Sequence, residues 1–170
     1  MKKHFKWVII IIAIPISILS LFSFDNLHPA GYEPVLMTRE SMEAAVQVRD
    51  PQEIERPGKI WVYNQYIFLI EQFRGIHVIN NVNPQDPKSE AFIHVDGCTD
   101  VAVKDGLIYA NNAVDLIGIK PDINHKTIEV VSRIRNVLPE LLPPDGLYPS
   151  KFQKFRPENT VIVRYEPYNK

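Results

Sequence analysis

Short runs of apolar and β-branched residues recur along most of the chain, and turn-forming residues separate them. Asn64 and Gln65 divide two of these runs, and Asp105 and Gly106 divide two others. Runs of this kind between such turns are typical of strands in antiparallel sheets. The strands predicted in this way cover residues 60–63, 66–70, 76–79, 91–95, 101–103, 107–110, 116–119, 128–134 and 160–165. The pattern therefore predicts a mainly β fold.

The apolar runs also repeat along the chain with a period near 40 residues. Three pairs of segments correspond in order: 66–68 with 107–109, 76–79 with 116–119, and 91–93 with 132–134. Several short strands within such a period are typical of a propeller blade. Two unrelated series of strands are the alternative, but agreement in both order and offset favours a repeat. The sequence thus predicts two blade-like antiparallel sheets.

Two repeats are too few for a complete propeller, which needs about four blades or more. The predicted repeats cover residues 59–98 and 99–136, and a proline-rich wrap with a last strand follows over 137–170. Two sheets can instead pack face to face. A sandwich-like or open arrangement is therefore expected in preference to a closed ring, and the last strand is expected to complete a neighbouring sheet.

The segment before the repeats contains one predicted helix. Residues 25–34 are rich in Pro, Gly and Asn and predict a linker. A short helix is predicted over 38–48, with Thr38 as its N-cap, and Asp50 before Pro51 ends it. Residues 25–58 are therefore expected to form a linker and a short helix.

An apolar segment, interrupted only by Pro15, Ser17, Ser20 and Ser23, occupies residues 7–24 near the amino terminus. Lys2, Lys3 and Lys6 precede it, and the first acidic residue is Asp25. A basic start followed by such a run predicts an export signal, and its length just suffices to span a bilayer. Small-residue cleavage sites are poor, so an uncleaved signal anchor is favoured over a cleaved signal peptide. Residues 1–24 then place the protein in the cell envelope, anchored in the inner membrane or exported.

Several segments resemble the LVIVD-repeat family of exported bacterial proteins, which are identified as β-propeller-like. The similar stretches are 75–84, Asp86 with Pro87, 100–106, 32–37 and 57–60. The last two resemble an uncharacterised Bacteroidetes-type branch, and the likeness covers about residues 32–135. The chain departs from many members in having no lipid-carrying cysteine after the apolar segment. The resemblance implies a propeller-type fold and no established activity.

The charge balance argues against a nucleic-acid partner. Without Lys2, Lys3 and Lys6, 16 of the 19 basic residues remain against 20 acidic ones, a balance of −4. A weakly acidic domain without a basic cluster has no electrostatic surface for phosphates. A second copy of the chain or a protein of the envelope is the expected partner, with the membrane reached through residues 7–24.

Neither the cysteine nor the histidines form a pattern typical of a catalytic or metal site. Cys98 is the only cysteine, and nearby Asp96 and Asp100 would raise the pKa of its thiol. It is therefore expected to be a packed turn residue. His77 and His94 lie on predicted strands without HxH or HxxxH spacing, and no calcium-loop pattern occurs. His77 is expected to point away from the face of its apolar neighbours. No metal, cofactor or catalytic residue is assigned.

Four residues are candidates for contact with a ligand or partner. Phe73 and Arg74 lie at an expected loop tip, and an aromatic side chain beside an arginine is typical of interface hot spots. An equal alternative is that Phe73 covers the end of a hairpin. Asp96 and Asp100 lie in the turn between the repeats and complete the set.

Two functions from different classes follow. The first is an extracytoplasmic, membrane-anchored binding or scaffold domain, because sheet edges and exposed turns offer surfaces for protein partners. The alternative is a small hydrolase or lyase in which His94, Asp96 and Asp100 converge on a pocket. The sequence contains none of the GxSxG, GxGxxG, Walker or HExxH motifs. The first function is therefore favoured.

Overall fold

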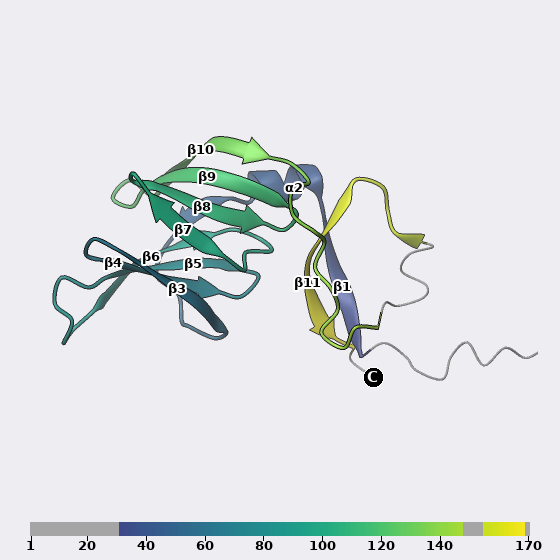
Figure 1. The fold of residues 1–170 in the computed structure, drawn as a ribbon, viewed down its shortest axis with the longest axis horizontal. Helices are drawn as coiled ribbons and strands as arrows, with labels where there is room; N and C mark the ends of the chain where they lie inside the picture. The colour runs from purple at the N-terminus through teal and green to yellow at the C-terminus, as the bar shows by residue number, and fades with distance from the viewer. Residues whose placement is uncertain (1–30, 148–154, 169–170) are drawn as a thin grey trace, which may run out of the picture.

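The computed structural model describes residues 31–147 and 155–168. These residues contain one helix and eleven strands, and the strands form three antiparallel sheets (Figure 1). The predicted mainly β fold is confirmed. In chain order the elements are β1 Tyr32–Thr38, α2 Arg39–Ala44, β2 Gln47–Arg49, β3 Pro57–Tyr63, β4 Tyr66–Glu71, β5 Gly75–Asn80, β6 Lys88–His94, β7 Val101–Lys104, β8 Leu107–Asn112, β9 Asp115–Asp122, β10 Thr127–Ile134 and β11 Thr160–Pro167.

Two of the sheets are successive up-and-down meanders. The first meander sheet has the order β2-β6-β5-β4-β3, and the second has the order β10-β9-β8-β7. Both are built on tight turns. Asp105 and Gly106 adopt left-handed φ angles of 52° and 77° between β7 and β8, as a two-residue hairpin with the right-handed strand twist requires. Asn64 takes the corresponding left-handed place, with φ 51°, between β3 and β4.

The two meanders repeat each other residue by residue. Phe68 pairs with Val78, and their equivalents Tyr109 and Gly118 pair in the second sheet. A β-bulge interrupts β6 where it pairs with Ile79, and another interrupts β10 after Val130. Because strand order, register and bulges coincide, the expected pairing of 66–68 with 107–109 and of 91–93 with 132–134 matches the structure.

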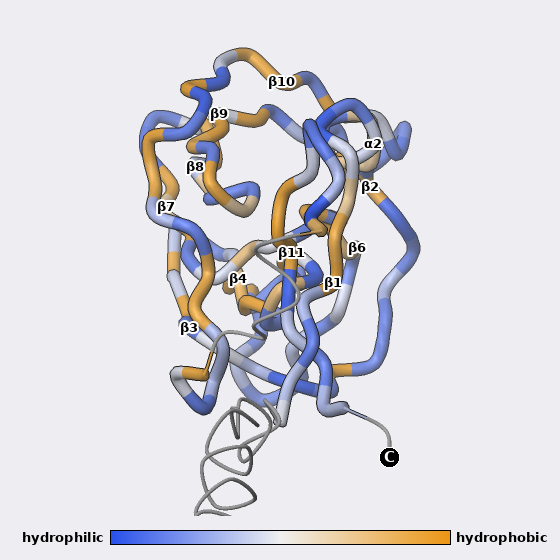
Figure 2. The backbone as a smooth tube through the Cα atoms, turned by 90° about the vertical axis from the view of Figure 1, so that its right-hand side faces the viewer, coloured by the Kyte–Doolittle hydropathy of each residue, from blue (hydrophilic) through white to orange (hydrophobic). Residues whose placement is uncertain are grey.

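The meander sheets lie one above the other and share one apolar core (Figures 1 and 2). Side chains alternate between the two faces of each strand, so one face of each sheet meets the other sheet. The core residues of these facing sides are Phe68, Ile70, Ile76, Val78, Ala91 and Ile93 of the first sheet and Val101, Val103, Ile108, Ala110, Ile117 and Ile119 of the second. Within the described residues no sheet closes into a barrel, and the two meander sheets pack against each other over this core.

The third sheet is a two-stranded ribbon of β1 and β11 that stands beside the ends of the meanders (Figure 1). A second, smaller core joins it to them. Met42 of α2 and Val161 and Val163 of β11 pack against Ala113 and Val114 in the β8–β9 turn. The ribbon is therefore held by the turn of the second meander sheet and by the helix.

Three sequence predictions need correction here. The last strand does not complete a meander; β11 pairs with β1, so part of the expected linker is a strand. The predicted helix over 38–48 begins as expected, since the Thr38 hydroxyl accepts a hydrogen bond from the Ser41 N–H, but it ends at Ala44. Val48 lies instead on β2, because pairing with β6 buries its side chain in the main core. Tertiary contacts outweigh helical periodicity at this point.

The predicted signal anchor or signal peptide of residues 1–24 lies outside the described residues. Among the residues described, no helix is long and apolar enough to span a membrane.

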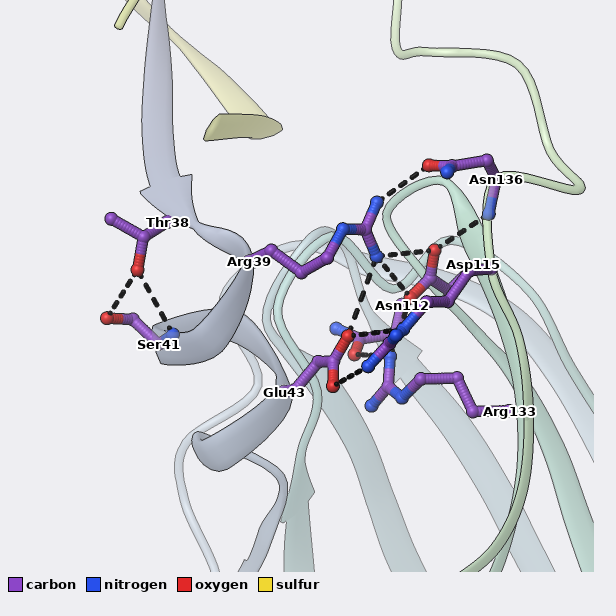
Figure 3. Close-up of polar contacts among 9 residues, drawn as sticks. Thr38, Arg39, Ser41, Glu43, Asn112, Asp115, Arg133 and Asn136 are labelled. Carbon is purple, nitrogen blue, oxygen red and sulfur yellow. Dashed lines mark hydrogen bonds and ion pairs between the residues drawn. The ribbon is translucent and has the colours of Figure 1, made fainter. Parts of the chain in front are cut away.

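A buried ionic network fastens the ribbon and helix to the second meander sheet (Figure 3). The side chain of Asp115, at the start of β9, is fully buried and accepts hydrogen bonds from the guanidinium groups of Arg39 and Arg133. It also accepts one from the backbone N–H of Asn136 at 3.0 Å. Glu43 of α2 extends the network to Arg39 at 3.6 Å. Residues distant in sequence are thus joined at one carboxylate.

The surroundings of Asp115 favour its ionised form. Burial alone would raise its pKa, but the hydrogen bonds from Asn136, Arg133 and Arg39 outweigh burial and hold the pKa below 3.8. The folded state is therefore stabilised by this carboxylate above pH 3.8. That contribution falls as the pH drops below 3.8 and is lost once the pH passes the lowered pKa of the folded state.

We expect Asp115→Asn to lower the free energy of unfolding by about 3 kcal/mol at neutral pH, because an amide removes the buried counter-charge of Arg133 and leaves Arg39 only its longer contact with Glu43. Urea unfolding of the full chain in mild detergent, followed by circular dichroism, measures the change. Asp86→Asn is the matched control, since among the described residues the Asp86 carboxylate pairs only with Lys88, at the surface. Equal stability of the two variants would contradict a structural role for Asp115.

Candidate functional site

A cleft of about 530 Å³ lies between the end of the first meander sheet and the ribbon. Its walls come from segments far apart in sequence: the loop before β3, the β4–β5 turn, the end of β6, and both ribbon strands. The lining residues are Glu33, Glu55, Arg56, Gln72, Phe73, Arg74, His94, Asp96, Arg164, Glu166 and Pro167. We refer to this hollow as the charged cleft.

The β4–β5 turn presents Phe73 and Arg74 to the charged cleft. Phe73 has a left-handed φ of 65°, which is uncommon for a bulky side chain. Its N–H donates to the Cys98 carbonyl at 2.7 Å, and its carbonyl accepts from the Gly97 N–H at 2.9 Å. Ala113, the equivalent residue of the second sheet, has a φ of 54°. The left-handed backbone is therefore a property of the repeated turn, and what distinguishes the cleft is the aromatic side chain placed there.

A second wall depends on the buried carboxylate of Glu71. This carboxylate accepts hydrogen bonds from the backbone N–H groups of Glu55 and Arg56 and lies 3.0 Å from His77 Nε2. Burial alone would raise the pKa of Glu71, but the hydrogen bond from His77 and those from the two backbone groups lower it below 4.5. An ionised Glu71 therefore fixes the loop that carries Glu55 and Arg56 against the sheet.

The charges in the cleft are only partly neutralised by one another. Arg74 pairs with Glu55 at 2.7 Å, and Arg164 pairs with Glu166 at 2.8 Å. The Arg56 guanidinium, by contrast, makes no hydrogen bond or ion pair with any other described residue, and Arg56 is exposed. The cleft thus holds one cationic group that a ligand or partner could engage without breaking an existing pair.

His94 and Asp96 form the remaining polar pair of the cleft. His94 Nε2 lies 3.1 Å from an oxygen of Asp96, and the Asp96 side chain is nearly buried. Such a pair orients an imidazole, but it supplies no nucleophile. Among the residues described, no group of three or more His, Cys, Asp or Glu side chains is arranged to hold a metal ion.

The structure brings together three of the four predicted contact residues. Phe73, Arg74 and Asp96 all line the charged cleft. Asp100 does not line it; its carboxylate pairs with Lys59 at 2.5 Å on an exposed surface. The convergence of Asp100 with His94 that the hydrolase hypothesis required is therefore not formed.

Sequence reasoning missed the residues that come from outside the repeats. Arg56 and Glu55 precede the first repeat, and Arg164 and Glu166 lie on β11. Nothing in their spacing links them to Phe73. The one available signal was the pair of adjacent charges just before Pro57, but only the tertiary structure places them at the cleft.

Cys98 is the packed residue that the sequence predicted. Its side chain is fully buried, and its thiol lies 3.7 Å from the Asp100 carbonyl oxygen. Burial raises the pKa of the thiol to about 12, and the charge of Asp100 adds to the increase. A thiol of this kind holds almost no thiolate at neutral pH, so Cys98 is not a nucleophile in the folded chain. His77 is likewise buried and points away from Ile76 and Val78, as expected, where it pairs with Glu71.

Compared with protein-family models, with curated proteins and with solved structures, the chain has no significant match in any of the three. The geometry of the described residues is therefore the basis for a functional proposal.

We expect the Cys98 thiol to resist alkylation in the native protein at pH 8, because it is buried and its pKa of about 12 leaves almost no thiolate. Mass spectrometry after iodoacetamide treatment measures the modified fraction. Addition of denaturant should give complete modification of the same sample. Rapid native alkylation would contradict the packed position.

We expect Glu71→Gln to loosen the wall of the charged cleft, because an amide cannot accept all three of the hydrogen bonds that the carboxylate accepts. Amide exchange at Glu55 and Arg56 should become about tenfold faster, as measured by hydrogen–deuterium exchange and mass spectrometry. Glu90→Gln is the matched control, since the Glu90 carboxylate bonds to Asn80 and to no other side chain in the described part of the chain, away from the cleft. Unchanged exchange in Glu71→Gln would contradict the anchoring role.

Proposed function

We propose that this protein is a binding or scaffold domain that contacts another protein of the cell envelope through the charged cleft. The observation that carries this proposal is the Arg56 guanidinium, which has no ion-pair partner among the described residues and lines the cleft with Phe73 and two internally neutralised ion pairs. A partner can add a carboxylate to this cleft without displacing a residue of the chain. A surface with a purely structural role does not need a cationic group that is free to accept a partner's carboxylate.

The composition of the cleft suits a protein segment as its ligand. Arginine and aromatic side chains supply much of the binding energy at protein interfaces, and Phe73 and Arg56 offer one of each. An acidic side chain of the partner would form a charge-assisted hydrogen bond to Arg56, with an apolar neighbour resting on the Phe73 ring. The partner is therefore proposed to be a protein whose exposed segment combines an acidic and an apolar residue.

The proposed location rests on the amino-terminal sequence. Lys2, Lys3 and Lys6 before the apolar residues 7–24 favour a chain exported through the membrane and retained by an uncleaved anchor. The resemblance of residues 32–135 to LVIVD-repeat proteins of the bacterial cell surface supports the same location. The cleft would then face the extracytoplasmic side.

Photo-crosslinking in the native membrane tests this proposal. With a photoreactive amino acid in place of Gln72, which lines the cleft, we expect one specific adduct with an envelope protein. The same residue in place of His125, which is exposed on the β9–β10 turn, should not form that adduct. Quantitative mass spectrometry of the purified adducts provides the measurement.

Charge removal then assigns the contact to Arg56. We expect Arg56→Ala in the Gln72-labelled chain to reduce the yield of the adduct about tenfold or more, because a charged hydrogen bond is lost. Lys88→Ala, which removes an exposed cation outside the cleft, should leave the yield unchanged. Equal yields from both variants, or crosslinking only from position 125, would refute the cleft as the contact site.

A further inference from the structure

The internal repeat has a consequence at the two outer faces of the sandwich. We name the face of the first meander sheet that points away from the core the first outer face, and that of the second sheet the second outer face. The first outer face carries Ile60, Val62, Ile67, Leu69 and Ile79, and the second carries Leu107, Tyr109, Leu116, Gly118, Ser132 and Ile134. The exposed apolar side chains of the first outer face lie around Ile60 and Val62, because Leu69 is already buried within the chain. On the second outer face Lys104, Lys120 and Glu129 lie beside the apolar residues.

The first outer face repeats the side of the second sheet that is buried in the core. At a shift of about 40 residues, Ile60 and Val62 correspond to Val101 and Val103, which are 4% and 7% exposed. Ile67 corresponds in the same way to the buried Ile108. Ile60 and Val62 themselves are 63% and 62% exposed. Side chains of a core type therefore lie uncovered on this face.

The second outer face repeats, in turn, the side of the first sheet that is buried in the core. Tyr109 corresponds to Phe68 and Ile134 corresponds to Ile93. Ile93 is completely buried, whereas Ile134 is 55% exposed. The two outer faces are thus the counterparts of two surfaces that already pack against each other within the chain.

An ion pair joins equivalent positions of the two sheets. Lys59 of the first sheet bonds to Asp100 of the second at 2.5 Å, and these two residues are themselves equivalent at a shift of 41. If the next sheet in the series came from another copy, its Lys59 would again face Asp100. The charges along this edge are therefore complementary between copies as well as within one chain.

We propose that the second outer face of one copy binds the first outer face of the next, so that copies continue the sheet-on-sheet packing head to tail. The contact continues the established interface between the two meanders and covers Ile60, Val62 and Ile134. A head-to-tail contact uses two different surfaces and forms a ring when its rotation closes. With two sheets per chain, two to four copies make the roughly four to eight blades found in propellers. The charged cleft is not part of this contact, so the proposal is independent of the proposed function.

One charged substitution on each face tests the proposal. Native mass spectrometry of the full chain, released from detergent, should give the mass of two or more copies of 19.6 kDa each for the wild type. Val62→Asp and Ile134→Asp each place a carboxylate at one face, and each should weaken self-association by at least about 30-fold and leave a monomer. Leu142→Asp, at a position 69% exposed in the proline-rich segment, should retain the wild-type mass.

Mixing the two variants distinguishes this contact from other kinds of association. Val62→Asp keeps an intact second outer face and Ile134→Asp keeps an intact first one, so an equal mixture should form a one-to-one dimer and nothing larger. Circular dichroism of each variant checks that the fold is retained; both positions are exposed. A monomeric wild type, a wild-type mass for either variant, or a mixture that stays monomeric would each overturn the proposal.

Discussion

The packing of the two meander sheets against each other is the constraint on which the rest of the structure depends. Neither sheet can bury its apolar face alone. One shared core, whose residues lie between Val46 and Ile128, buries the apolar faces of both sheets. Cys98 and Val95 lie in the connection between the sheets and are themselves part of this core. The relative position of the two sheets therefore also determines the position of the turn before Cys98. This turn forms one wall of the charged cleft.

Two buried carboxylates attach the parts of the chain that do not repeat. Asp115 joins α2 and the segment after β10 to the second sheet, and Glu71 holds the loop before β3 on the first. Each lies next to the turn that contains a left-handed residue, Phe73 beside Glu71 and Ala113 beside Asp115. Because both carboxylates are ionised and fully hydrogen-bonded, their burial is compensated. The two repeated meander sheets thus form the main body of the domain, and the buried ion pairs attach the loops and the ribbon to it.

The charged cleft arises where the repeating and non-repeating parts meet. The meander supplies Phe73 and Asp96, whereas the ribbon supplies Arg164 and Glu166. Binding sites built on loops and turns beside a rigid sheet can vary without disturbing the core. The outer faces have the opposite character, since their residues follow the repeat itself. Partner contact at the cleft and self-association at the faces would therefore use separate surfaces of one small domain.

Local sequence pattern by itself determined the strands and the repeat, because alternation and turn residues such as Asn64 and Gly106 act over a few residues. It also selected Phe73, Arg74 and Asp96 as candidate contact residues, and the structure places all three at the charged cleft. Only the tertiary structure decided that β11 pairs with β1, that Val48 lies on a strand, and that Asp100 bonds to Lys59 away from the cleft. These contacts join residues distant in sequence, and their outcome depends on which buried surfaces and charges compete for one place. A local sequence pattern does not show which of these distant contacts forms.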